Sequence, residues 1–241
     1  MGEDGMSKAE DGETFRQRRE AMKEHINVLD RDQIASHPDR KAFFDTVYAQ
    51  ANGDEAAVPW ADLQPKQQLQ QWLASNPGKG RTAIDIACGL GDNAEAMAAA
   101  GYRTTAFDLA QEAISWARKR FAQSTVDYQV ADLLSPPPAW GDGFDLVHEC
   151  YTLQAVPPSM LQGMTAAIAD LVAPGGTLLV YTRIRPDGSE TSGPPWPLQE
   201  SDAMGFAEHG LALVSRDAFE LVRPDRRIPH WFCVWQKPEQ A

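Results

Sequence analysis

The sequence is poor in cysteine, in basic side chains and in long apolar runs. Its three cysteines, Cys88, Cys150 and Cys233, lack a metal-ligand spacing, and their odd number argues against a disulfide framework. The 22 Lys and Arg are outnumbered by 34 Asp and Glu, which argues against a general nucleic-acid binder. No stretch approaches the ~20 apolar residues of a membrane span, and residues 1–13 lack the apolar core of a signal peptide. We therefore expect a cytoplasmic protein with no metal and with neither nucleic acid nor membrane as a partner.

The length of the chain fits one α/β domain with a helical extension. The chain has 241 residues, and a single domain of this class can reach about 200–250 residues. A hydrophobic content of 43% is enough for a sizeable core. We expect residues 1–14 to form a disordered tail, because they are small and charged. Residues 15–76 should form an N-terminal helical cover, and residues 77–241 the core domain.

The stretch from residue 82 to residue 108 is the most informative part of the sequence. Residues 83–87 are mostly apolar and too few for a buried helix, so they predict a strand that is buried on both faces. Gly89 and Gly91 then break the chain. Asp92 follows where an N-cap residue would open a helix.

A second strand and an acid complete this pattern. Residues 94–100 are small enough for a helix that lies close on a sheet, and Gly101 follows as a C-terminal cap. Residues 102–107 predict the second strand, with Asp108 at its carboxyl end. This acid lies 108 − 91 = 17 residues after Gly91, close to the ~20 expected between a glycine loop and a ribose-binding carboxylate. The order of elements indicates a site for a nucleotide-type ligand.

The glycine loop lacks the third glycine of a dinucleotide fingerprint, which disfavours a nicotinamide dehydrogenase. Two carboxylates, Asp85 and Asp92, flank the loop. Carboxylates repel phosphate and attract ammonium or sulfonium groups. Such a loop suits an adenosine ligand with a cationic amino-acid tail. We therefore expect S-adenosylmethionine as the cofactor and S-adenosylhomocysteine as its product.

Residues 85–92, Asp-Ile-Ala-Cys-Gly-Leu-Gly-Asp, closely resemble the first motif of class I methyltransferases, with Ala87 where the first glycine usually stands. Residues 144–148 are similar to the fourth motif of that family, and residues 172–180 to its fifth strand. The resemblance implies an α/β, Rossmann-like, doubly wound and mostly parallel seven-stranded sheet. It also implies an antiparallel last strand and an N-terminal helical cover.

The resemblance assigns further roles around the cofactor. After the third expected strand, it implies that Asp132 binds the adenine amino group and that the backbone N–H of Leu133 meets a ring nitrogen. A turn or helix-capping role for Asp132 is the alternative, because prolines follow at residues 136–138. The residues expected at the cofactor are Tyr48, Trp60, Asp85, Ala87, Cys88, Gly89, Gly91, Asp92, Asp108, Leu109, Asp132, Leu133, Glu149 and Cys150.

Residues 47–61 resemble the N-terminal cover of the thiopurine and tellurite-resistance branch of these enzymes. The resemblance implies that Tyr48 and Trp60 flank the methionine end of the ligand. A Trp face beside a sulfonium has a physical reason, a cation–π attraction of roughly 0.5–2 kcal/mol. The alternative is that both aromatic residues pack between helices.

The acceptor site should lie beyond the carboxyl ends of the fourth and fifth strands, as in other open α/β sheets. We expect Tyr151, Arg183 and Trp196 to line it. Residues 193–197, Gly-Pro-Pro-Trp-Pro, form a rigid segment that is too long for a simple turn and predicts a lid or pocket wall. Glu149 and Tyr151 are the candidate general bases.

These features predict a methyltransferase of a small molecule, with a thiol, another chalcogen or a heteroaromatic group as the acceptor. Such a transfer depends on alignment, and a thiol with a pKa near ~8.5 is already partly ionised at neutral pH. Two alternatives stay open: an O- or N-methyltransferase of a phenolic or quinoline-like compound, and a non-catalytic S-adenosylmethionine-binding protein. The expected oligomeric state is a monomer or a homodimer.

Overall fold

The computed structural model describes residues 15, 17–19, 22, 40–191, 193–223 and 225–239. The tail predicted for residues 1–14 lies outside these residues, as does most of the helix expected within residues 15–29. Among the described residues, no helix is long and apolar enough to cross a membrane.

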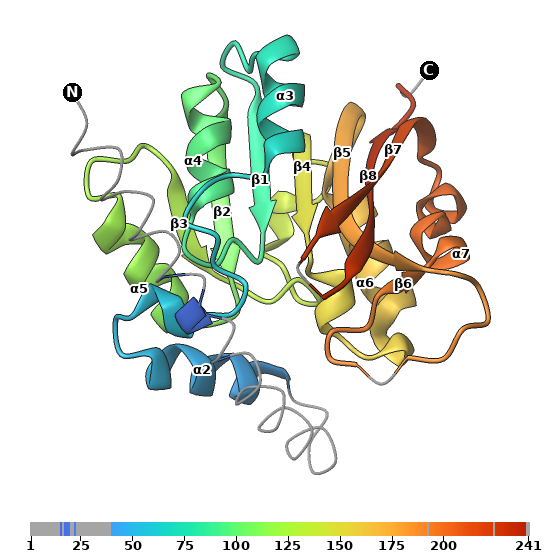
Figure 1. The fold of residues 1–241 in the computed structure, drawn as a ribbon. Coiled ribbons are helices and arrows are strands. Elements are labelled where there is room, and N and C mark those ends of the chain that lie inside the picture. Colours follow the sequence, from blue (N-terminus) through green and yellow to red (C-terminus); the bar gives the residue numbers. More distant parts are fainter. Residues whose placement is uncertain are drawn as a thin grey trace, which may run out of the picture.

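A single mixed sheet forms the centre of the molecule (Figure 1). Its strands lie in the order β3-β2-β1-β4-β5-β8-β7, and the short β6 pairs with β5. The strands are β1 Thr82–Ile86, β2 Arg103–Asp108, β3 Asp127–Val130, β4 Phe144–Cys150, β5 Val172–Arg185, β6 Leu198–Gln199, β7 Ala212–Val222 and β8 Arg227–Gln236. The first five strands run parallel, and β8 is antiparallel to both of its neighbours. The predicted Rossmann-like sheet with an antiparallel last strand is confirmed.

Helices cover both faces of this sheet, because successive residues of a strand point to opposite faces. The helices are α2 Arg40–Ala51, α3 Gln67–Ser75, α4 Asp92–Ala99, α5 Gln111–Arg120, α6 Leu161–Leu171 and α7 Glu200–Ala203. The face that packs against α6 contributes residues that include Ile84, Val147, Leu178 and Trp235. The face that packs against α3 and α4 contributes their chain neighbours Ala83, Leu146, Leu179 and Val234.

The expected cap of α4 is wrong by one residue. Asp92 is the first helical residue, and Gly91 is the N-cap in a left-handed conformation with φ 90°. A β-carbon at Gly91 would lie 2.4 Å from the hydroxyl oxygen of Tyr128. Position 91 therefore requires glycine for both its backbone conformation and the space around it.

The C-terminal strands are long. Strand β5 extends from Val172 to Arg185, beyond residues 172–180 that resemble the fifth strand of the family, and its pairing with β4 shifts register between Phe144 and Leu146. Strand β7 is one continuous edge strand with a register shift between Leu213 and Ser215. Most of β7 is exposed because no further strand covers it among the described residues.

Residues 40–61, which include α2, lie beyond the carboxyl ends of β1 and β4 (Figure 1). Tyr48 and Val58 of this segment are buried together with Leu90 of the glycine loop and Ala110 and Ala113 at α5. The segment therefore completes part of the core in addition to lying over the loop. This packing favours the alternative in which the aromatic residues of the segment also serve the fold.

Candidate functional site

The glycine loop between β1 and α4 is a tight backbone turn. Ala87, Gly89 and Gly91 all have left-handed φ values, of 49°, 54° and 90°. The loop is tied to the next strand, because the N–H of Cys88 donates to the carbonyl of Phe107 at 2.8 Å. Ala87 is exposed, so its methyl group meets no obstacle. The left-handed backbone conformation of Ala87 costs about 1–2 kcal/mol, because the residue is not glycine.

Asp108 joins this loop to the start of α5. Its carboxylate accepts hydrogen bonds from the N–H of Gly89 and from the N–H of Ala110, both at 3.0 Å. The side chain is buried, and burial raises its pKa to about 6 while the N–H groups of Ala110, Gly89 and Leu109 oppose that rise. Each carboxylate oxygen has a second lone pair. Asp108 can therefore hold the loop and still accept a hydrogen bond from a ligand hydroxyl.

Tyr48 and Trp60 stand against the same loop. The indole N–H of Trp60 donates to the Tyr48 hydroxyl at 2.8 Å, and the two rings meet edge to face. A β-carbon at Gly89 would lie 3.4 Å from the Tyr48 hydroxyl and 3.8 Å from the Trp60 ring. Burial, followed by the charge of Asp108, raises the pKa of Tyr48 well above its usual value. The two aromatic residues predicted at the cofactor thus lie together at Gly89 and near Asp108.

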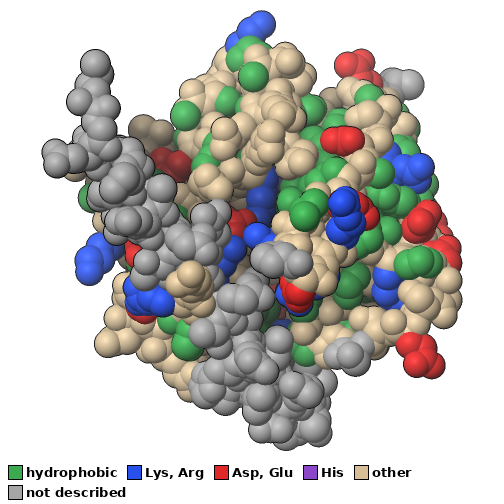
Figure 2. Space-filling view, viewed as in Figure 1, with side chains coloured by type: hydrophobic (Ala, Val, Ile, Leu, Met, Phe, Trp, Pro, Cys, Tyr) green, Lys and Arg blue, Asp and Glu red, His purple; other side chains and the backbone are tan. Residues whose placement is uncertain are grey.

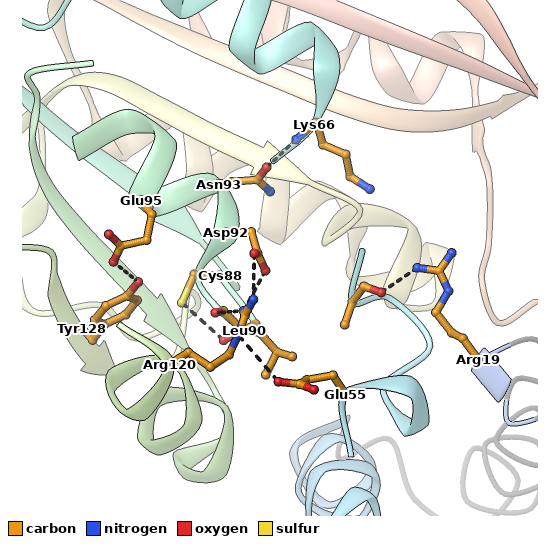
Figure 3. A network of polar contacts seen from close by, with 12 residues as sticks. Arg19, Glu55, Lys66, Cys88, Leu90, Asp92, Asn93, Glu95, Arg120 and Tyr128 are labelled. Carbon is orange, nitrogen blue, oxygen red and sulfur yellow. Dashed lines mark hydrogen bonds and ion pairs between the residues drawn. The ribbon is translucent and has the colours of Figure 1, made fainter. Parts of the chain in front are cut away.

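The two carboxylates that flank the loop, Asp85 and Asp92, both have partners within the protein. Asp85 is buried and lies 2.7 Å from Nδ1 of the equally buried His148. Asp92 forms two hydrogen bonds with Arg120, at 2.8 and 2.9 Å, and Arg120 also donates to the carbonyl of Leu90 (Figure 3). Charges that are removed from water need partners. The sequence pattern showed the acids but not these partners.

The residues expected at the adenine end lie in a turn after β3. The N–H of Leu134 donates to the Asp132 side chain at 2.9 Å, which is the turn role that the sequence left open. Asp132 is exposed, whereas Leu133 is buried in the core beneath it. The contact of both residues with adenine stays a prediction.

Glu149 lies at the carboxyl end of β4, opposite Ile86 of β1 and therefore next to the glycine loop. Its Oε1 accepts from the N–H groups of Thr152 and Leu153 at 2.7 and 3.1 Å. Its Oε2 is buried and has no hydrogen-bond partner within the described part of the chain. Burial raises the pKa of Glu149 to about 7, although the two N–H groups oppose the shift. Glu149 can therefore exchange a proton near neutral pH.

Cys150 follows Glu149 and is partly exposed. Burial of its thiol raises the pKa of Cys150 far above the usual range, despite the opposing charge of Lys66. The thiol thus stays protonated at neutral pH. A protonated thiol is a poor nucleophile, so Cys150 is not a candidate for covalent catalysis.

Tyr151 begins the acceptor side of the site, which we define as Tyr151, Tyr181, Arg183, His230 and Lys66. The Tyr151 hydroxyl lies 2.8 Å from Nε2 of His230, whose Nδ1 lies 2.7 Å from the carbonyl of Ile228. A carbonyl can only accept, so Nδ1 carries the hydrogen and Nε2 accepts from Tyr151. Burial lowers the pKa of His230 to about 4, so that the imidazole is neutral.

Arg183 and Lys66 place two cations around the Tyr151 ring. The Arg183 guanidinium lies 5.6 Å from the ring centre, and the Lys66 ammonium lies 4.6 Å from it. Lys66 also forms an ion pair with Asp62, and its backbone N–H donates to Asn93 of α4 at 3.0 Å (Figure 3). Lys66 therefore connects the acceptor side to the helix that follows the glycine loop.

Trp196 is linked to this group through Gln154. The N–H of Trp196 donates to the backbone carbonyl of Gln154 at 2.8 Å, and the side-chain oxygen of Gln154 accepts from the N–H of Arg183 at 2.9 Å. The Trp196 ring also lies 5.7 Å from the guanidinium carbon of Arg40, the first residue of α2. The segment predicted as a pocket wall therefore joins the acceptor side to the N-terminal segment.

The structure thus gathers the predicted residues in two neighbouring groups, one at the glycine loop and one on the acceptor side. Figure 2 shows a hollow in this face of the molecule, with Lys or Arg and Asp or Glu side chains in its walls. The sequence pattern missed Lys66, Tyr181, Arg120 and His230. Only their positions in the fold reveal them, because the hydrogen bond between Tyr151 and His230, for example, spans 79 residues. Within the described ranges, no group of three or more His, Cys, Asp or Glu could hold a metal ion.

Part of the chain is similar to known methyltransferases. Residues 83–176 match the family described as a methyltransferase domain. The ubiquinone biosynthesis O-methyltransferase of Aromatoleum aromaticum is 36% identical over 114 residues, which cover 46% of this chain and 48% of that protein. The chain thus spans about half the length of the curated relatives that it matches.

Two solved structures are similar in fold. The N-methyltransferase NodS from Bradyrhizobium japonicum, in complex with S-adenosylhomocysteine, has a TM-score of 0.62 at 20% identity, covering 81% of this chain and all of that one. Magnesium protoporphyrin IX methyltransferase from Synechocystis, with bound S-adenosylhomocysteine, has a TM-score of 0.63 at 16% identity, covering 83% and 100%. The match over residues 83–176 and the similarity in fold support the predicted resemblance to class I methyltransferases. The finer resemblance to the thiopurine and tellurite-resistance branch is not confirmed.

Proposed function

We propose that the protein is an S-adenosylmethionine-dependent methyltransferase that methylates a phenolic oxygen of a small aromatic molecule. The observation that carries the proposal is the convergence of Asp108, Tyr48 and Trp60 on Gly89. Gly89 and Asp108 belong to residues 83–176, which match a methyltransferase domain, whereas Tyr48 and Trp60 come from the preceding segment. The thiol acceptor that the sequence favours gives way here to the phenolic alternative.

The residues at the glycine loop fit the chemistry of this cofactor. Gly89 lacks a side chain where Tyr48 and Trp60 approach, so the loop presents its backbone there. Asp108 retains lone pairs for ribose hydroxyls, and Glu149 has a buried oxygen with no partner in the described chain. Tyr48, Trp60, Asp108 and Glu149 would hold the cofactor on this proposal. When bound, S-adenosylmethionine supplies an electrophilic methyl group on a sulfonium.

Two observations support a phenol over a thiol as the acceptor. Curated relatives at 36% and 38% identity are ubiquinone biosynthesis O-methyltransferases. In addition, a phenol with a pKa near ~10 is protonated at neutral pH and must lose its proton, whereas a thiol is already partly ionised. Glu149, with a pKa of about 7, suits this proton transfer. Tyr151 is the weaker candidate base, because burial raises its pKa above the usual value and lowers that of its partner His230 to about 4.

A matched panel of acceptors tests this function. We would measure methyl transfer from labelled S-adenosylmethionine to catechol, to thiophenol and to 8-hydroxyquinoline, together with calorimetric binding of S-adenosylhomocysteine. Turnover of catechol well above that of thiophenol is the expected result. Preferred turnover of thiophenol would restore the thiol reading, and tight binding without turnover of any acceptor would favour a non-catalytic binding protein.

A further inference from the structure

Arg183 differs from three other enclosed cations of this acidic chain. The side chains of Arg19, Lys66 and Arg120 are 7%, 11% and 17% exposed, and each forms an ion pair with an aspartate. The guanidinium of Arg183 forms no ion pair and no hydrogen bond within the described residues, and its Nε is buried. A buried donor without an acceptor is destabilising. The chain has 34 acidic residues, yet none of the described ones neutralises this arginine.

The surroundings of Arg183 make a positive, aromatic site. Tyr151 and Tyr181 meet edge to face with ring centres 5.2 Å apart, and Phe219 stacks on His230 with centres 5.4 Å apart. After burial, the charges of Arg183 and Lys66 contribute to the low pKa of His230. His230 is therefore a neutral hydrogen-bond acceptor in a region of positive potential.

Arg183 is also held in place. Its backbone N–H donates to Gln154, and the pairing of β5 with β8 sets Arg183 opposite His230. The residue is partly exposed, so its remaining donors are accessible to a ligand. A planar guanidinium with free donors matches a carboxylate, which can accept two parallel hydrogen bonds.

We propose that the methyl acceptor is an aromatic carboxylate whose anionic group pairs with Arg183 while its ring lies against Tyr151. The carboxylate supplies acceptors for the accessible donors of the guanidinium, and the pairing fixes the phenolic oxygen relative to the cofactor. Arg183 is then a specificity-determining residue. This inference rests on the proposed function, because it names the class of acceptor at the same site.

A pair of acceptors that differ in one charge tests the inference. We would compare 3,4-dihydroxybenzoate with its methyl ester, which keeps the same two phenolic groups. In the unmodified protein, kcat/KM should favour the acid by about 10–100-fold, the range of one charged hydrogen-bonded pair. Arg183→Gln should remove this preference, chiefly through the KM of the acid, and Arg183→Lys should restore part of it.

Arg216→Gln is the matched control. Arg216 also lies over an aromatic ring, with its guanidinium carbon 4.3 Å from the Trp231 ring centre, but it is exposed on β7. This change should leave the acid-to-ester preference intact. Equal use of acid and ester by the unmodified protein would overturn the inference, as would an equal loss for both acceptors in Arg183→Gln.

Calorimetry separates this inference from the proposed function. Benzoate, which has no phenolic oxygen to methylate, would be titrated into the protein saturated with S-adenosylhomocysteine. Binding that is lost in Arg183→Gln supports the anion site even if no phenol is turned over. Turnover of neutral phenols with no benzoate binding would leave the methyltransferase proposal standing and overturn the carboxylate.

Discussion

The glycine-loop side and the acceptor side of the site treat their polar groups in opposite ways. Around the loop, Asp85 pairs with His148, Asp92 pairs with Arg120, and Asp108 binds backbone N–H groups. On the acceptor side, the Arg183 guanidinium has no partner in the described chain. The pairs around the loop hold its backbone in place before any ligand arrives, which reduces the ordering cost of binding. We propose that a ligand anion instead completes the hydrogen bonding of Arg183, which would place specificity on the acceptor side.

We expect the largest effect on stability and cofactor binding from a substitution in the glycine loop. Gly91→Val must adopt the φ of 90° and place its β-carbon 2.4 Å from the Tyr128 hydroxyl. Strain and overpacking together should lower the free energy of unfolding by about 3–5 kcal/mol and abolish cofactor binding. Urea denaturation and calorimetry measure both.

Gly188→Val provides the control for backbone strain alone. Gly188 also has a left-handed φ, of 72°, but a β-carbon there would meet nothing within 4 Å. Its cost should stay within about 1–3 kcal/mol. From the sequence alone, we expect Gly91→Val to lose cofactor binding while the fold stays largely intact. Equal stability of Gly91→Val and Gly188→Val would support that expectation and contradict the overpacking at Tyr128.

The pH dependence of stability tests the state of Glu149, the buried acid beside the glycine loop. Burial raises its pKa from 4.5 to about 7, so the folded state holds this proton more tightly than the unfolded chain. The free energy of unfolding should therefore fall as pH rises from about 4.5 to about 7 and stay level above that. Glu149→Gln should remove this decline, by at most about 3 kcal/mol. Parallel pH profiles for the two proteins, from urea denaturation, would contradict the assignment.

Asp108→Asn tests how much the charge of this carboxylate contributes to cofactor binding. The variant keeps the shape of the side chain but removes the charge that binds Gly89 and can accept from a ribose hydroxyl. Calorimetry should show S-adenosylhomocysteine bound about 10–100-fold more weakly, as expected for a lost charged hydrogen bond. Asp127→Asn, an exposed acid on β3, is the control. An unchanged dissociation constant in folded Asp108→Asn would remove this residue from the site.

The fold was predictable because its signals are local. The apolar run before Gly89, the turn glycines and the acid at position 108 follow one another within one βαβ unit. The predicted start of α4 was wrong because backbone geometry overrides side-chain preference there: Gly91 caps the helix without a side chain.

The chemistry of the site was less predictable because its partners are distant in sequence. The pairs between Asp85 and His148 and between Asp92 and Arg120 span 63 and 28 residues. Neither His148 nor Arg120 carries a sequence signal for its role. A free carboxylate and a paired one look identical in a sequence, although their physical consequences differ.

Amide hydrogen exchange with and without S-adenosylhomocysteine tests the central claim most directly, namely that the cofactor lies between the glycine loop and residues 40–62. Amide exchange should slow in residues 87–92 and 40–62 when the ligand binds, while the exchange rates of the exposed edge strand β7 should stay unchanged. Exchange that is already slow in residues 40–62 and indifferent to ligand, with no change in the loop, would contradict it.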